Sequence, residues 1–259
     1  MTRWLRIARL ALHLARGLFT AAFFFPFQSV AQRNQETQRW ASRLLEVLAV
    51  HLHAHGAPDS ARPLMLVANH VSWLDIFSVD AVLPVRFVAK SEVRRWPLVG
   101  WLSARAGTLF IEQARRRDTA RINAVVTECL RAGEVFAVFP EGTTTDGSRL
   151  LKFHASLLAP ALEVDAMLQP VAIRYERVDG SLCTEVAFDG VRSLWDTVMG
   201  ITGQREVHVH VHFLAPLPAQ GRHRRDIAAD AHQAINRSLF PPAPSNRSGT
   251  GAGLPAAAH

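Results

Sequence analysis

The sequence predicts an α/β fold: a single domain with a mostly parallel central sheet flanked by helices, preceded by an N-terminal membrane-associated helical segment. Three observations support this prediction. Short apolar runs of strand length alternate with amphipathic stretches of helical length between residues 47 and 240. Hydrophobic residues make up 49% of the 259 residues, which is enough to build one large core. The N-terminal segment is strongly apolar and yet contains arginine.

This N-terminal segment, residues 4–27, is typical of a helix that lies in the membrane interface. Its uninterrupted apolar part, 17–27, is much shorter than the roughly 20 residues that a spanning helix needs. On a helical projection Arg6, Arg9 and Arg16 fall on one side, with tryptophan and phenylalanine elsewhere. We therefore expect a monotopic anchor on a membrane surface. Two alternatives remain open: a single span from about residue 10 to residue 27, and ordinary packing of this helix on the core.

Each later element is predicted from its own local pattern. The stretch 32–45 is amphipathic with a helical period, and 47–55 alternates as a strand. A helix over 118–132 has Asp118 as its expected N-cap and Gly133 as its stop. The apolar runs are short and bounded by turn residues, as buried parallel strands are. In order, the remaining expected strands are 64–68, 85–89, 109–111, 135–139, 167–175 and 206–214, and the remaining helices are 73–82, 96–106, 156–162 and 224–239.

Three regions follow from these patterns. Residues 1–45 form the membrane-associated helices. Residues 46–240 form one domain, because no linker splits them. Residues 241–259 are rich in proline, glycine, serine and alanine, and we expect a disordered tail.

The charge balance favours an anionic partner. Lysine and arginine number 29 against 22 acidic residues, a surplus that suits an acidic membrane surface or a nucleic acid. Aromatic residues do not interleave with the basic runs as stacking platforms would require, so we expect no nucleic-acid partner. Two cysteines, Cys129 and Cys183, lie far apart, which argues against a disulfide scaffold and suits a reducing compartment.

Two groups of histidines alternate along the chain, at 51, 53 and 55 and at 208, 210 and 212. Alternation is what one face of a strand shows. A metal site would normally need acidic or cysteine partners beside such histidines. We therefore expect no metal site.

The strongest functional signal is Asn69-His-Val-Ser-Trp-Leu-Asp75, at the end of a buried strand. His70 is suited to take and return a proton near neutral pH, and a carboxylate such as Asp75 would fix its tautomer. Open α/β sheets place their chemistry at strand ends of this kind. A second interpretation is that Ser72 and Asp75 form a capping box for the following helix. The two roles are compatible, because a cap would hold Asp75 still.

The same residues resemble the His-x4-Asp motif of the glycerolipid acyltransferases, of the lysophosphatidic acid acyltransferase type. Three further motifs of that family follow in order. Gly107-Thr-Leu-Phe-Ile-Glu-Gln113 resembles the second block, Phe139-Pro-Glu-Gly-Thr143 the third and Leu168-Gln-Pro-Val-Ala-Ile173 the fourth. Each motif alone is weak, but four in register over more than 100 residues are a strong signal.

The resemblance implies transfer of a fatty acyl group from acyl-CoA or acyl carrier protein to the hydroxyl of a lysophospholipid acceptor. Because the thioester is already activated, His70 is the expected catalytic base, Asp75 is its orienting partner, and no enzyme nucleophile or cofactor is needed. The oxyanion requires amide or hydroxyl donors, which we expect from the region of Asn69 or from the turn at Gly142 and Thr143. Glu141 is either a turn carboxylate or, as the resemblance favours, part of the substrate site.

A phosphate-bearing acceptor needs cations, and here the chain departs from the family. The second block usually ends in arginine, whereas this chain has Gln113, and Thr144 stands where many members have arginine. An amide cannot neutralise a phosphate, so either nearby cations bind it or the acceptor has another head group. The candidate cations are Lys90, Arg115, Arg116 and Lys152, and the arginine run is equally interpretable as a solvated helix start.

The leading expectation is therefore a 1-acylglycerol-3-phosphate acyltransferase that makes phosphatidic acid at the inner (cytoplasmic) membrane, with its active site facing the cytoplasm. The alternative acceptor is a lyso-ornithine lipid or another lysolipid. A serine hydrolase using Ser72 or Ser91 is less favoured, because no Gly-x-Ser-x-Gly elbow presents a serine. A non-catalytic membrane-binding protein ranks below the enzyme, because it has no need of the His70 and Asp75 pair.

Overall fold

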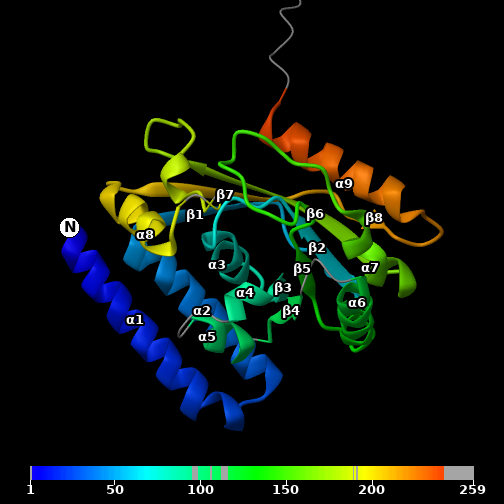
Figure 1. Ribbon diagram of the computed structural model, residues 1–259, viewed down its shortest axis with the longest axis horizontal. Coiled ribbons are helices and arrows are strands. Elements are labelled where there is room, and N and C mark those ends of the chain that lie inside the picture. The colour runs from blue at the N-terminus through cyan, green and yellow to red at the C-terminus, as the bar shows by residue number, and fades with distance from the viewer. Residues whose placement is uncertain are drawn as a thin grey trace, which may run out of the picture.

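The computed structural model describes residues 2–94, 99–105, 107–111, 116–188, 190 and 192–241. At its centre is an eight-stranded sheet in the order β1-β7-β6-β2-β5-β3-β4, with β8 beside β6 (Figure 1). Only β7 and β8 run antiparallel to β6, and the other described strand pairs are parallel. This confirms the predicted mostly parallel α/β sheet. The strands are β1 Val50–His55, β2 Leu64–Ala68, β3 Arg86–Lys90, β4 Leu109–Ile111, β5 Phe136–Val138, β6 Met167–Glu176, β7 Val207–Phe213 and β8 Leu217–Pro218.

Helices cover both faces of the sheet. One face packs against α1, α2, α3 and α8, and the other against α6, α7 and α9 (Figure 1). Strand β2 shows why both layers are needed: Leu64, Leu66 and Ala68 face the first group, while Met65 and Val67 face the second. The helices are α1 Arg3–Phe23, α2 Val30–Leu48, α3 Leu74–Asp80, α4 Ser91–Arg94, α5 Val99–Arg105, α6 Arg116–Arg131, α7 Ala159–Glu163, α8 Leu194–Gly203 and α9 Arg224–Leu239, with 3-10 turns Phe25–Phe27, Ala155–Leu158 and Thr184–Val186.

Helix α1 lies along the domain rather than apart from it. Arg6 donates to the carbonyls of Gln204 and Arg205 at 2.6 and 2.5 Å. The His13 ring stacks on the Trp40 indole of α2 with centroids 4.7 Å apart, and its Nε2 lies 3.0 Å from the Trp40 carbonyl. Of the three arginines that we placed on one side of this helix, Arg6 is therefore buried against the domain, whereas Arg9 and Arg16 are exposed.

The opposite side of α1 remains apolar and exposed. Among the described residues, helix α1 with the turn that follows it is the one segment long and apolar enough to cross a membrane. Its exposed large residues, with those of the turn after it, are Trp4, Leu5, Leu12, Phe19, Phe23, Phe24 and Phe27.

Several predicted boundaries shift. Helix α2 continues to Leu48 and ends through Ala49 at φ 56°, so β1 begins at Val50 and not at 47. Helix α6 begins at Arg116, so Asp118 lies inside the helix and is not its N-cap. Helices α4 and α8 and strand β8 were not expected. Of the predicted disordered tail, 241–259, all but Pro241 lies outside the described residues.

Candidate active site

The site lies where two neighbouring parallel strands, β2 and β5, end. Strand β2 leads through α3 to β3 on one side, and β5 leads through α7 to β6 on the other. Helices α3 and α7 pack on opposite faces of the sheet. The loops that follow β2 and β5 therefore diverge, which is the arrangement that leaves a ligand crevice in open α/β sheets.

His70 and Asp75 meet at the end of β2, as predicted from their spacing. His70 Nδ1 lies 2.7 Å from Asp75 Oδ2. The Asp75 side chain is fully buried, whereas 21% of the His70 side chain is exposed. With Nδ1 engaged by the carboxylate, Nε2 is the ring nitrogen left for a substrate.

Asp75 is held by four donors. Besides His70, its Oδ2 accepts from the backbone amides of Val71 and Ser72 at 2.7 and 2.9 Å. Its Oδ1 accepts from the hydroxyl of Tyr175 at 2.8 Å. The Ser72 hydroxyl accepts from the amide of Leu74 at 3.3 Å. The N-cap residue of α3 is Trp73, which makes no side-chain cap, and the Asp75 amide donates to the Ser72 carbonyl, so the capping box that we expected between Ser72 and Asp75 is not formed. The same carboxylate thus fixes the backbone that leads into α3 and faces the imidazole.

Glu141, in the loop after β5, fixes the backbone of His70. Its Oε1 accepts from the His70 amide and its Oε2 from the Leu151 amide, each at 2.8 Å. The His70 carbonyl accepts from Thr145 in the same loop at 2.9 Å. Burial raises the pKa of the Glu141 carboxyl, and the two amides oppose that shift. Both carboxyl oxygens are thus engaged with backbone amides, an arrangement that suits a positioning role better than the substrate contact we expected.

Asn69 is committed to the fold. Its side-chain nitrogen donates to the Ile173 carbonyl at 2.9 Å, and its oxygen accepts from the Ile173 amide at 2.7 Å. This pair joins β2 to β6 next to the site. The Asn69 side chain is therefore unsuited to donate to an oxyanion. In the other expected source, the turn at Gly142 and Thr143, the Gly142 amide donates to the Phe139 carbonyl at 3.1 Å, which leaves Thr143.

An apolar cavity opens beside His70. Its volume is about 860 Å³, within the roughly 300–1,000 Å³ typical of ligand pockets. The His70 ring stacks on Phe139 with centroids 4.0 Å apart, which holds its plane at the cavity wall. The cavity runs from His70 and Thr143 to helices α1 and α2. Its apolar lining includes Leu10, Leu14, Trp40, Phe77, Phe87 and Phe139.

Of the predicted binding residues, some line the cavity, one is exposed, and the others have side chains or positions outside the described structure. Gly142 adopts φ 72°, which favours glycine, and both it and Thr143 line the cavity. Lys152 is exposed and follows Leu151, whose amide binds Glu141. Lys90 ends β3 and Arg116 begins α6, but their side chains are not described. Gln113 and Arg115 lie outside the described residues.

The serine alternatives have little support from the geometry. Ser72 is completely buried, and its hydroxyl accepts from a helix amide. Ser91 begins the short helix α4. Neither arrangement presents a hydroxyl to the imidazole of His70 in the described structure.

Tyr175 is the site residue that we did not predict from the sequence. It is the only tyrosine in the chain, lies two residues beyond the fourth motif, and is buried in β6. A buried tyrosine hydroxyl usually has a hydrogen-bond partner. The position of Tyr175 beside the fourth motif was therefore the sequence signal that could have placed its hydroxyl near the site. Burial raises the pKa of Tyr175 well above its ordinary value, so the group stays a donor.

Comparison with known proteins shows the family and the fold of this chain. A family model described as Acyltransferase matches residues 30–174. The lyso-ornithine lipid O-acyltransferase of Pseudomonas aeruginosa is 40% identical over 242 residues, which cover 91% of this chain and 93% of that protein. The 1-acyl-sn-glycerol-3-phosphate acyltransferase of Neisseria meningitidis is 37% identical over 183 residues, 70% of this chain and 71% of its own. The fold matches the crystal structure of the 1-acyl-sn-glycerophosphate acyltransferase from Thermotoga maritima with a TM-score of 0.60 at 20% identity, over 90% of this chain and 96% of that one.

Proposed function

Because the chain belongs to the acyltransferase family, as an O-acyltransferase of the lysophospholipid type, we propose that it transfers a fatty acyl group to the hydroxyl of a lyso-ornithine lipid. The observation that carries the transfer step is the His70 and Asp75 pair at the wall of an apolar cavity. The acceptor rests on similarity along nearly the whole chain to a protein of that name. This reverses the order of our two expectations, in which 1-acylglycerol-3-phosphate came first.

In the proposed step His70 Nε2 takes the proton of the acceptor hydroxyl as its oxygen attacks the thioester carbon. A C–O bond forms, and the carbonyl oxygen becomes an oxyanion. When the oxyanion collapses the C–S bond breaks, and the leaving thiolate takes the proton from the imidazolium. Asp75 holds the imidazole in the tautomer that makes Nε2 the base. The amide and hydroxyl of Thr143 are the proposed oxyanion donors, because the Gly142 amide already donates to the Phe139 carbonyl at 3.1 Å.

The cavity supports an acyl substrate. Side chains from α1, α2, α3 and β3 give it apolar walls that extend away from His70. Each methylene removed from water contributes about 0.8 kcal/mol, so a long acyl chain gains much of its binding energy there. A head group would stay on the polar side, near Thr143.

The head group decides between the two acceptors. An ornithine lipid has an amino-acid head group in place of a phosphate monoester. Gln113 replaces the arginine that usually ends the family's second motif, and an amide does not neutralise a phosphate. This departure supports the ornithine acceptor independently of the similarity to relatives.

The test is acyl transfer by the purified full chain, with acyl-CoA and acyl carrier protein as donors and a panel of lysolipids as acceptors. We expect kcat/KM for lyso-ornithine lipid to exceed that for 1-acylglycerol-3-phosphate by about tenfold or more, a difference of about 1.4 kcal/mol. Gln113→Arg is expected to narrow this difference. A preference of the wild type for 1-acylglycerol-3-phosphate would overturn the ornithine acceptor and leave the acyl transfer intact.

His70→Ala provides the control for the chemistry. Loss of a general base costs about 100- to 10,000-fold in kcat. The variant is therefore expected to lose activity with every acceptor while keeping its thermal unfolding temperature. Full activity of His70→Ala with any acceptor would show that another group is the base.

We further propose that the enzyme acts on the inner (cytoplasmic) membrane with its site facing the cytoplasm. The exposed apolar side of α1 lies on the helix whose buried side lines the cavity. A helix placed in this way would bring the cavity close to lipid. Acyl-CoA and acyl carrier protein are both found in the cytoplasm, which sets the proposed orientation.

A further inference from the structure

Six histidines lie together on strands β1 and β7, and the proposed acyl transfer uses none of them. The two strands are parallel, and their register places His51 opposite His208, His53 opposite His210 and His55 opposite His212. On β7 the alternate residues, including Val209 and Val211, are buried in the core layer that contains α1, α2 and α3. The imidazoles therefore lie on the opposite face of the sheet from His70 and its cavity.

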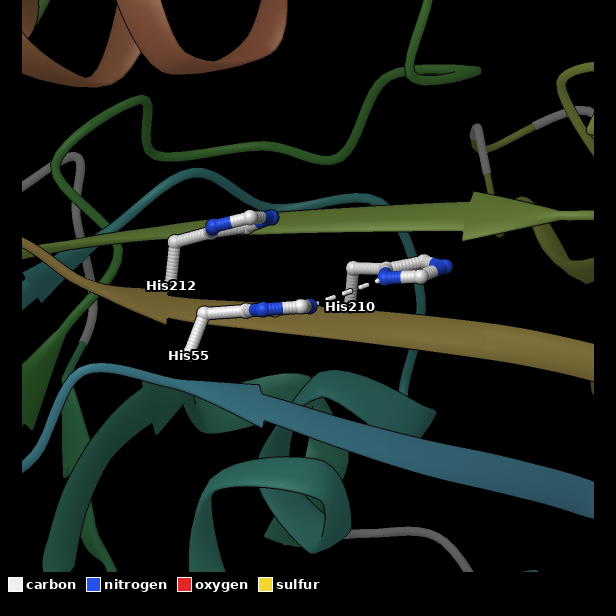
Figure 2. A group of neighbouring side chains, drawn as sticks. All are labelled: His55, His210 and His212. Carbon is white, nitrogen blue, oxygen red and sulfur yellow. Dashed lines mark hydrogen bonds between the residues drawn. The ribbon is translucent and has the colours of Figure 1, made fainter.

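Three of these imidazoles converge at one end of the pair of strands. Figure 2 shows His55, His210 and His212 over the same face of β1 and β7. One nitrogen of each ring can be chosen so that all three lie within 4.8 Å of one another. His55 is exposed and the other two are half-buried, so the group is open to solvent on one side.

The spacing of the first two nitrogens matches that of ligands on one metal ion. His55 Nε2 and His210 Nδ1 lie 3.1 Å apart and face each other. Two imidazoles bound tetrahedrally to zinc at about 2.0–2.1 Å have their nitrogens about 3.3 Å apart. An ion can replace the single proton that the two nitrogens share if they move apart by a few tenths of an ångström and both rings turn so that their lone pairs point at the ion. His212 stacks on His55 with centroids 4.2 Å apart, and one of its ring nitrogens lies within 4.8 Å of the other two ligand atoms, so a rotation of its side chain is needed for it to bind the same ion.

An acidic partner stands beside these histidines, contrary to what we expected from the sequence. Glu176 of β6 places Oε2 3.5 Å from His210 Nε2. Its other oxygen accepts from Arg174 at 2.6 Å. A histidine that binds metal through one nitrogen usually donates from the other to a carboxylate or carbonyl. Glu176 is placed for that role, because His210 presents Nδ1 to His55 and Nε2 to Glu176.

We propose that His55, His210 and His212 bind one divalent transition-metal ion of the kind that prefers imidazole, with Zn²⁺ as the reference ion. The fourth position belongs to water, because the group is open to solvent. The ion ties the edge strand β1 to β7. This site is independent of the proposed acyl transfer, because it lies on the other face of the sheet.

The test is titration of metal-free full-length protein with Zn²⁺ in competition with a chromophoric chelator at neutral pH. We expect one ion per chain and a rise in the thermal unfolding temperature when it binds. His55→Gln is expected to weaken binding by about tenfold or more, and His210→Gln with His212→Gln to abolish it. Glutamine keeps a polar side chain on these solvent-facing positions, and circular dichroism without metal checks that each variant folds.

Two matched controls localise the ion. His51→Gln removes a histidine from the same group of six but not from the proposed three, and His223→Gln removes one at the start of α9. Both are expected to bind Zn²⁺ with the wild-type affinity. Co²⁺ in the wild-type protein is expected to show the visible absorption of a four-coordinate ion with nitrogen ligands. The proposal is overturned if the double variant binds as tightly as the wild type, if His51→Gln weakens binding as much as His55→Gln, or if the wild type does not bind below millimolar Zn²⁺.

Discussion

At the scale of single residues, Asp75 shows how a structural role and the proposed orienting role can share one carboxylate. The backbone amides of Val71 and Ser72 fix it at the start of α3, and Tyr175 reaches it from β6. An ionised carboxylate only accepts hydrogen bonds, and here all of its described partners are donors. The imidazole of His70 thus faces an acceptor that the rest of the fold holds in place.

Removing the hydroxyl of Tyr175 tests this positioning role. We expect Tyr175→Phe to lower kcat several-fold with KM unchanged, because Asp75 loses the donor that restrains Oδ1. The cost in unfolding free energy is expected to be about 1.5–3 kcal/mol, the range for a hydrogen bond to a charged group. Steady-state kinetics and thermal unfolding measure the two effects.

The control is another buried hydroxyl. Thr202 donates to the Val198 carbonyl at 2.7 Å inside α8. Thr202→Val is expected to lower stability and leave kcat unchanged. If both variants lost kcat in proportion to their stability, the role of Tyr175 would be structural only.

Asp80 gives a pH-dependent prediction. Burial raises its pKa from 3.8 to about 8, against an opposing hydrogen bond from the Val85 amide. The folded protein thus keeps this proton where the unfolded chain has lost it, and stability falls as the pH rises from about 4 to about 8. Across that window the loss is on the order of 5 kcal/mol.

Asp80→Asn cannot ionise and can still accept from Val85. We expect it to unfold at a higher temperature than the wild type at pH 8, by about 5 °C or more, and to lose this advantage at pH 4. Thermal unfolding across this range of pH measures the difference. An advantage that did not change with pH would exclude the ionisation of Asp80 as its cause.

Residue patterns in the sequence identify the pair at the centre of the site but not its supports. The spacing of His70 and Asp75 on one strand end suffices to bring them together. Tyr175 is a hundred positions away from Asp75, and its contact depends on β6 pairing with β2 in one register. The amide partners of Glu141 likewise come from two different loops. Such contacts require the assembled sheet.

At the scale of elements, the packing of α1 on α2 depends on one small residue. Gly17 lies where a Cβ would come within 2.4 Å of the Trp40 indole. Trp40 in turn stacks on His13 and lies edge-on to Phe77 of α3. The glycine thus allows α1 to lie close enough to α2 to form a wall of the cavity.

Gly17→Ala tests this contact. In an exposed helix this change stabilises by about 0.5–1 kcal/mol, but here we expect a loss of about 1–3 kcal/mol because Trp40 must move. Thermal unfolding measures the loss, and faster tryptic cleavage within α1 is expected to accompany it. The matched control is Ala15→Gly on the exposed side of the same helix. This variant is expected to lose only the unfolding free energy that corresponds to the lower helix propensity of glycine. A stabilised Gly17→Ala would mean that α1 packs less closely than described.

The elements themselves were predictable where their pattern is continuous. The apolar runs at β2, β5 and β6 and the amphipathic stretch at α9 are confirmed. We did not predict helix α8 from the sequence, because glycines interrupt its apolar pattern. Ser193 and Asp196 form a capping box at its N-terminus, which is a sequence signal for the start of a helix. The short strand β8 exists through its pairing with β6, which no local pattern shows.

At the scale of the whole molecule, the cavity is a product of long-range packing. Its walls combine α1 and α2, from the first 48 residues, with α3, β3 and the end of β5. Local patterns predict each of these elements but not the space between them. The sequence therefore predicted the histidine at one end of the cavity, which we propose as the base, while the apolar walls that support an acyl substrate required the assembled fold.

The outer side of α1 leads to the last prediction, which concerns the membrane. Phe19, Phe23 and Phe27 are exposed there, with 55%, 61% and 89% of their surfaces accessible. Apolar side chains on an interfacial helix bind by burial in the lipid boundary. We expect the triple change of these residues to serine to release the protein from sedimenting lipid vesicles and to lower activity on vesicle-bound lysolipid.

Activity on a detergent-dispersed acceptor is expected to persist in this variant, because His70 and its partners are untouched. Val178→Ser, at an equally exposed apolar position in the loop after β6, is the control and is expected to leave vesicle binding unchanged. Vesicle binding that survived the triple change would place the membrane contact elsewhere on the molecule. If binding were lost while activity on vesicles stayed intact, the acceptor would reach the cavity without docking of α1.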